Sequence, residues 1–150
     1  MIVYRLTTGN FAKDISGTGA KLYGGRWNPV GLAVLYTSQY VSLAILEILV
    51  RATRSTSPDS YTLTSFEIPD KTIYQVQLKK LKTEWKNDLI YTQGIGEDFL
   101  SENQCLCLQV PSAIVPQENN FLINPIHRDF QRVKIVGSEL LELDKRLMMQ

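Results

Sequence analysis

The segment from Tyr40 to Arg54 constrains the fold most, because it has the pattern of a helix that is apolar almost all round. Between Tyr40 and Val50, Glu47 is the one acidic or basic side chain, and its neighbours are leucine, isoleucine, alanine and valine. Such a helix is expected to be buried, with Ser38 as its N-cap. A lone carboxylate in apolar surroundings is costly, so Glu47 is expected to be paired, neutral or lining a ligand cavity.

Short strand-like runs surround this helix, and they predict an α+β fold with a mixed or antiparallel sheet. The whole chain, residues 1–150, is expected to form a single compact domain. Thr7 to Gly25 is rich in glycine and predicts a long irregular loop, and Thr92 to Asn103 predicts a second helix. The expected strands are Met1–Leu6, Leu32–Ser38, Tyr61–Ile68, Ile73–Leu78, Cys105–Val110 and a closing pair at Val133–Val136 and Leu140–Leu143.

Composition narrows the class of partner. The formal net charge is +1 and the basic residues are scattered, which argues against general nucleic-acid binding. There is no run long enough to span a membrane and no signal-peptide pattern at Met1, so a soluble, cytoplasmic protein without a membrane partner is expected. Cys105 and Cys107 have no second Cys or His pair near them, which favours buried free thiols and predicts no metal site.

A series of short motifs resembles the RES domain family, which is named for an Arg, a Glu and a Ser. The motifs occur in the family's order over nearly the full length, and the Gly-Gly-Arg-Trp-Asn run is the most specific of them. They are Tyr4-Arg5, Gly19-Ala20, Gly24-Gly25-Arg26-Trp27-Asn28, Tyr36-Thr37-Ser38, Glu47, Val110-Pro111-Ser112, Asn124-Pro125 with His127, and the tail Asp144-Lys145-Arg146-Leu147.

The resemblance implies a fold similar to that of ADP-ribosyltransferase toxins. It implies the toxin half of a bacterial type II toxin–antitoxin pair, whose protein partner is an Xre-like helix-turn-helix antitoxin. Family members consume NAD as a substrate, by phosphorolysis or hydrolysis of the bond to nicotinamide, and at least one modifies a protein instead. No permanently bound cofactor is expected.

Physical chemistry gives the matching residues specific roles in such a site. Glu47 is the expected catalytic carboxylate, because cleavage of an N-glycosidic bond develops positive charge on the ribose. Arg5 and Arg26 are the expected pyrophosphate ligands, and Arg26 is also a catalytic candidate. Tyr36 offers an aromatic face to nicotinamide, and Ser112 is expected to bond substrate or to orient the attacking group.

Each role has a structural alternative. Glu47 and Arg51 are four residues apart, so they can form a helix-surface pair that contributes about 0.3 to 0.5 kcal/mol. Arg26 can brace its loop, Tyr36 can belong to the core, and Ser112 can cap a turn after Pro111. The remaining candidates, Asn124 and His127, are weaker, since a histidine after Asn-Pro is more often structural than catalytic.

Other functions share the same residues. A mono-ADP-ribosyltransferase that modifies a protein differs from an NAD-degrading enzyme only in the acceptor. A toxin directed at RNA would use Arg26, Glu47 and His127, although the near-neutral charge disfavours it. A non-catalytic interaction module is the last alternative.

Overall fold

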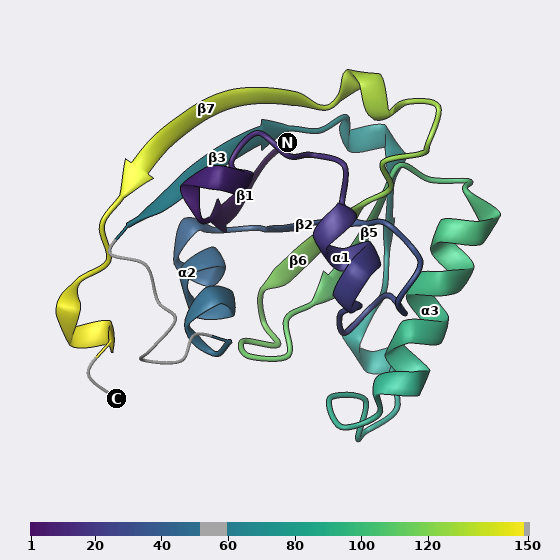
Figure 1. Ribbon diagram of the computed structural model, residues 1–150. Helices are drawn as coiled ribbons and strands as arrows, with labels where there is room; N and C mark the ends of the chain where they lie inside the picture. Colours follow the sequence, from purple (N-terminus) through teal and green to yellow (C-terminus); the bar gives the residue numbers. More distant parts are fainter. Residues whose placement is uncertain (52–59, 149–150) are drawn as a thin grey trace.

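One seven-stranded sheet organises the chain, in the order β4-β5-β6-β2-β1-β3-β7 (Figure 1). This computed structural model describes residues 1–51 and 60–148. β4 and β5 are parallel, and the other neighbouring strands are antiparallel. The predicted α+β class with a mixed sheet is confirmed. The strands are β1 Ile2–Thr7, β2 Leu35–Ser38, β3 Tyr61–Glu67, β4 Ile73–Gln75, β5 Cys107–Pro111, β6 Asn119–Ile123 and β7 Lys134–Leu141.

The sheet has two wings that barely touch. β1 pairs with β3 along all of Ile2–Thr7, and β2 pairs with β6 along all of Leu35–Ser38. Between β1 and β2, by contrast, the ladder has a single register pair, Tyr4 opposite Ser38. The β1-β3-β7 wing and the β4-β5-β6-β2 wing therefore diverge from this point. Beyond Tyr4 and Ser38, the backbones of β1 and β2 are not paired with each other.

Two helices cover different wings of the sheet. Helix α2 (Val41–Leu49) packs Ala44 against Leu6 and Leu63 of the β1-β3-β7 wing. Helix α3 (Leu89–Glu102) packs Leu100 in the cluster that covers the other wing. Figure 1 shows α2 on the left and α3 on the right, with α1 (Thr18–Tyr23) between them in the view. A third cluster of buried side chains comes mainly from the strands and the residues next to them: Val3, Leu35, Phe66, Ile68, Leu106, Cys107, Phe121 and Ile123.

The glycine-rich segment from Thr7 to Gly25 is more ordered than predicted. It contains a 3₁₀ turn at Gly9–Phe11 and helix α1, so the expectation of an irregular loop is wrong for these residues. Gly17 and Gly24 flank α1 with φ of 72° and 70°, a region that favours glycine. A Cβ at Gly17 would also lie 2.7 Å from the backbone N of Val34. These glycines therefore begin and end a short helix instead of preventing one.

Helix α2 is shorter and less buried than predicted. It ends at Leu49, before Arg51, and the predicted end at Arg54 lies outside the described residues. Its fully buried side chains are Leu43 and Ala44, whereas Leu46 is 36% exposed. The helix covers one wing of the sheet and leaves its other side open, so the prediction of burial all round is wrong.

The predicted N-cap of α2 is also wrong. Ser38 is the last residue of β2, and Tyr40 occupies the cap position without a side-chain hydrogen bond. The Ser38 hydroxyl donates instead to Asn120 Oδ1 on β6, at 2.8 Å. The Ser38 hydroxyl therefore bonds across the sheet to β6 and does not cap α2.

Strand β7 replaces the predicted closing pair of strands. Lys134–Leu141 is continuous, with Gly137 and Ser138 paired to β3 inside the ladder. Each residue of β3 from Tyr61 to Glu67 has a register partner in β7, so the Gly-Ser pair stays in the ladder and does not turn the chain. A register shift beside Phe66 accommodates the irregularity.

Strand β6 was not among the predicted strands, and β2 and β4 are each three residues shorter than predicted, whereas β1, β3 and β5 lie within two residues of the predicted bounds. Helix α3 begins three residues earlier than expected because Asp88 Oδ1 caps it, accepting from the N–H of Tyr91. Cys107 is buried and Cys105 is half-buried, and both are free thiols. In residues 1–51 and 60–148 there is no helix that is long and apolar enough to cross a membrane.

Candidate active site

A cleft of about 360 Å³ opens where the two wings of the sheet separate. Its walls are β1, β2, α1, the Gly24–Asn28 turn and α2. The volume is in the range of small-molecule sites. Among the residues that the structure describes, the charged side chains that line it are Arg5, Arg26 and Arg51 together with Asp14 and Glu47.

Glu47 projects from α2 into this cleft and is held by one of its two oxygens. Its Oε1 accepts from Ser112 Oγ at 3.0 Å and from Asn120 Nδ2 at 2.5 Å. Ser112 is fully buried, and its Oγ in turn accepts from the backbone N–H groups of Ile114 and Val115. The hydroxyl of Ser112 therefore donates its proton to Glu47. Ser112 and Asn120 together hold the carboxylate through its Oε1 atom.

The second carboxylate oxygen has a different environment. Among residues 1–51 and 60–148, Oε2 of Glu47 accepts no hydrogen bond, and Glu47 forms no ion pair with Arg51. The predicted alternative of a helix-surface pair between these two side chains is therefore not what the structure contains. Arg51 lies beyond the end of α2 and lines the cleft separately.

The Gly24–Asn28 turn forms the wall opposite α2. Gly25 N donates to Asn28 O at 2.9 Å, which closes the turn. Asn28 is fully buried, and its Nδ2 donates to the carbonyl oxygens of Ala20 and Leu32, both at 2.9 Å. One asparagine thus ties the turn to both flanking segments.

Helix α3 supports this turn from outside. A Cβ at Gly96 would lie 1.5 Å from Trp27 O, so the glycine in mid-helix permits direct backbone contact. Gln93 Nε2 donates to the carbonyl oxygen of Gly25 at 2.9 Å. Trp27 is 2% exposed and packs on Trp85 with ring centroids 5.7 Å apart, which anchors the turn in the core.

Tyr36 lies on β2 at the floor of the cleft. Its hydroxyl donates to Asn28 Oδ1 at 2.7 Å and accepts from Trp27 N at 3.1 Å. Burial raises the pKa of Tyr36 to about 12. The phenol is therefore neutral near pH 7 and its oxygen is committed to the turn, so the part that remains for a ligand is the ring.

Two of the three arginines, Arg5 and Arg26, are held by backbone oxygens. Arg5 Nη1 donates to the backbone oxygen of Asp14, and Arg26 Nη1 donates to the backbone oxygen of Lys86 at 2.6 Å. In the described part of the chain, neither Arg5 nor Arg26 is within 4 Å of a carboxylate oxygen. Burial lowers the pKa of Arg5, and the Asp14 charge opposes that shift. An arginine stays protonated near neutral pH, so the cleft carries desolvated positive charge suited to an anion.

Comparison with known sequences agrees with the motif pattern. A family model described as the RES domain matches residues 2–144. The chain belongs to the RES domain family. This RES domain is 39% identical to a protein named Toxin Res from Photorhabdus laumondii, covering 99% of this chain and 97% of that protein. It is 36% identical to a Sphingobium protein named Prs ADP-ribosylating toxin, covering 82% and 80% of the two chains.

A solved structure shares the fold of this RES domain. The match is to the M. tuberculosis MbcT–MbcA toxin–antitoxin complex, with a TM-score of 0.78. It covers 98% of this chain and 86% of the other, at 18% identity. At that identity the likeness concerns the fold.

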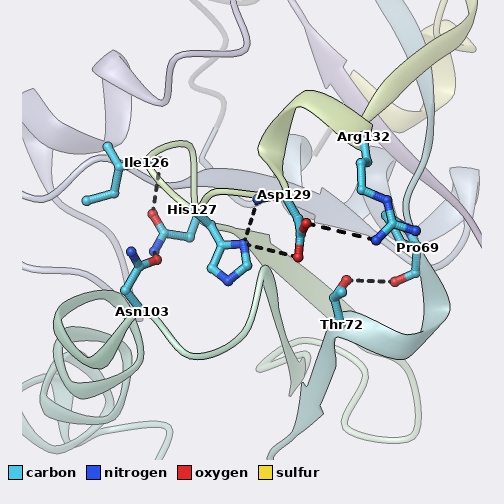
Figure 2. Close-up of polar contacts among 8 residues, drawn as sticks. Pro69, Thr72, Asn103, Ile126, His127, Asp129 and Arg132 are labelled. Carbon is cyan, nitrogen blue, oxygen red and sulfur yellow. Dashed lines mark hydrogen bonds and ion pairs between the residues drawn. The ribbon is translucent and has the colours of Figure 1, made fainter.

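The RES domain places Asn124 and His127 away from the cleft, in the connection between β6 and β7. Asn124 is fully buried and donates to Asn103 Oδ1 at 2.9 Å, and its own Oδ1 accepts from Ile126 N. His127 Nδ1 accepts from Asp129 N at 3.1 Å (Figure 2). These side chains close a turn, and neither lines the cleft.

Three cleft residues of the RES domain were not site candidates from the sequence. Asp14 lies in the glycine-rich segment, and Arg51 was considered only as a partner for Glu47. Asn120 is the most informative omission, because it bonds to Glu47 directly. Its signal is the strand register, Ser38 opposite Asn120, which the sequence of one strand does not contain.

Proposed function

We propose that this protein is the toxin of a toxin–antitoxin pair and that it cleaves the bond between nicotinamide and ribose in NAD. The observation that carries the proposal is the carboxylate of Glu47, which is held at Oε1 by two donors and lines the same cleft as three arginines. Membership of the RES domain family and relatives named Toxin Res support the toxin assignment.

The role of Glu47 follows from the charge that develops during cleavage. The bond from the anomeric carbon to the nicotinamide nitrogen breaks, and its electron pair leaves with neutral nicotinamide. The ribose becomes positively charged, and a fixed carboxylate stabilises that charge more than it stabilises the ground state. An oxygen of water or phosphate then forms the new bond to the anomeric carbon.

The cations of the cleft suit the other half of the substrate. Arg5 and Arg26 retain N–H donors beyond the one that each uses on a backbone oxygen. Planar guanidinium groups bind phosphate oxygens in pairs, so these two arginines hold the pyrophosphate. Arg51 extends the same positive surface along α2.

Tyr36 and Ser112 have separate parts in this scheme. The Tyr36 ring packs against nicotinamide, while its hydroxyl stays bonded to Asn28. Ser112 is buried behind Glu47 and acts through it, by orienting the carboxylate instead of touching substrate.

A protein acceptor is the second candidate. The Sphingobium relative is named an ADP-ribosylating toxin, and the same cleft would serve if a protein side chain replaced water or phosphate. Purified protein should be incubated with NAD alone, with phosphate, and with cell extract. Free ADP-ribose or its phosphate ester supports the first proposal, label transferred to protein supports the second, and RNA loss with intact NAD contradicts both.

An Xre-like antitoxin is proposed to act by covering the cleft. Tyr23 lines the cleft and is 84% exposed, and the nearby apolar side chains of Leu22 and Val30 are 60% and 68% exposed. A structure of the complex with the cleft open, or antitoxin binding that is unaffected by Tyr23→Glu, would contradict this.

A further inference from the structure

Asn120 connects Glu47 to the junction of the two sheet wings. It lies on β6 opposite Ser38 of β2, and Ser38 is also the residue that pairs with Tyr4 of β1. Its Nδ2 donates to Glu47 Oε1 at 2.5 Å, and its Oδ1 accepts from Ser38 Oγ at 2.8 Å. Asn120 and Ser38 both line the cleft.

The chemistry of these partners fixes the orientation of the Asn120 amide. An ionised carboxylate only accepts hydrogen bonds, so the NH₂ group of Asn120 must face Glu47. Its carbonyl oxygen must then face Ser38, whose hydroxyl supplies a proton. The hydrogen bond from Ser38 on β2 therefore orients the Asn120 amide so that its NH₂ group donates to Glu47.

The two donors to Glu47 reach the same oxygen. Ser112, which directly follows β5, and Asn120 on β6 both donate to Oε1. Two donors at one oxygen fix the plane of the carboxylate. Oε2 accepts no hydrogen bond from the residues that the structure describes.

We propose that Asn120 is a positioning residue for Glu47: with Ser112 it occupies Oε1 and reserves Oε2 for the substrate. The proposal rests on the proposed NAD cleavage for its catalytic consequence. Among the described residues, the other ionisable groups that line the cleft with Glu47 are Tyr4, Arg5, Asp14, Tyr23, Arg26, Tyr36 and Arg51. Substitutions at Asn120 leave those groups in place.

Asn120→Asp tests the proposal, because it keeps the shape and replaces the donor by a second carboxylate. We expect kcat for NAD cleavage to fall by about 10- to 100-fold with a smaller change in KM, because the reacting oxygen is misplaced. The acidic limb of the pH profile should move to higher pH, since a like charge disfavours ionised Glu47. Asn120→Ala should lower kcat with a smaller movement of the limb.

Asn119→Asp is the matched control. Asn119 is the preceding residue of β6 and its Nδ2 donates to Gln39 Oε1, so this change adds the same charge without touching Glu47. It should leave kcat and the pH profile close to wild type. Wild-type kcat and an unmoved acidic limb in folded Asn120→Asp would overturn the proposal.

A second measurement does not depend on the substrate. Carbon-13 NMR of glutamate-labelled protein, with the Glu47 signal assigned from Glu47→Gln, should show a displaced Glu47 carboxyl signal in both Asn120 variants and an unchanged one in Asn119→Asp. An unchanged signal in folded Asn120 variants would overturn the positioning role. Absence of NAD cleavage by the wild-type protein would instead overturn the proposed function. The NMR measurement would then still show whether Asn120 positions Glu47.

Discussion

Two groups of buried or half-buried polar side chains supplied site candidates from the sequence, but they differ in how much hydrogen-bonding capacity they leave unused. In the turn between β6 and β7, Asn124 and His127 bond to neighbouring groups on the same or adjoining loops. At the cleft, Glu47 has one oxygen bonded twice, and the other accepts from no described residue. A buried polar residue therefore indicates a site when bonding capacity and charge remain unsatisfied, and a structural role when they do not.

Replacing Glu47 should have the largest effect. Glu47→Gln keeps the size of the side chain and removes its charge, so we expect activity to fall by at least about 100-fold and growth arrest to be lost. His127→Gln, a comparable change in the turn, should leave growth arrest intact. The comparison fails if both variants arrest growth equally while both remain folded by circular dichroism.

Replacing Arg26 should weaken substrate binding. Loss of one charged contact to the pyrophosphate is expected to lower kcat/KM by about 10- to 100-fold in Arg26→Ala. Arg26→Lys should lose less, because it keeps the charge but not the paired donors. Steady-state kinetics check this, and an unchanged KM in Arg26→Ala would place the pyrophosphate elsewhere.

Two substitutions at Tyr36 distinguish the role of its ring from the role of its hydroxyl. Tyr36→Phe should retain activity per folded molecule, whereas Tyr36→Ala should lose it. The Phe variant loses two hydrogen bonds and should unfold more easily, by about 1 to 2 kcal/mol. Equal activity of the Ala and Phe variants would show that the ring does not contact the substrate.

The raised pKa of Tyr36 also predicts a pH dependence. The unfolded phenol ionises near pH 10, whereas the folded one, which burial holds neutral, ionises only near pH 12. Wild-type stability should therefore fall as pH rises from 10 to 12, and the stability advantage over Tyr36→Phe should shrink in that window. Denaturant unfolding of both proteins at pH 8, 10 and 11 measures this, and a constant difference would contradict it.

The smallest effect on activity is expected in the turn. Asn124→Ala leaves Asn103 and the N–H of Ile126 without their partner, so the free energy of unfolding should fall by about 1 to 3 kcal/mol. Activity per folded molecule should match wild type. A selective loss of kcat in folded Asn124→Ala would mean that the turn contributes to the site.

The sequence indicated the parts that depend on local pattern. Alternation placed β1 and β3, and the isolated carboxylate pointed to Glu47 as a residue with a special environment. The roles of the site residues stay predictions, although Arg5, Arg26, Tyr36 and Glu47 do line one cleft. What local pattern did not contain was pairing between distant strands: the cross-strand bond of Ser38, the continuity of β7 and the position of Asn120.

The most direct test is nicotinamide release from NAD by purified wild-type protein and by Glu47→Gln, free of antitoxin. We predict that wild type releases nicotinamide in step with NAD loss and that Glu47→Gln, with an unchanged melting temperature, does not. Intact NAD with the wild-type protein, or equal release by both proteins, would contradict the account.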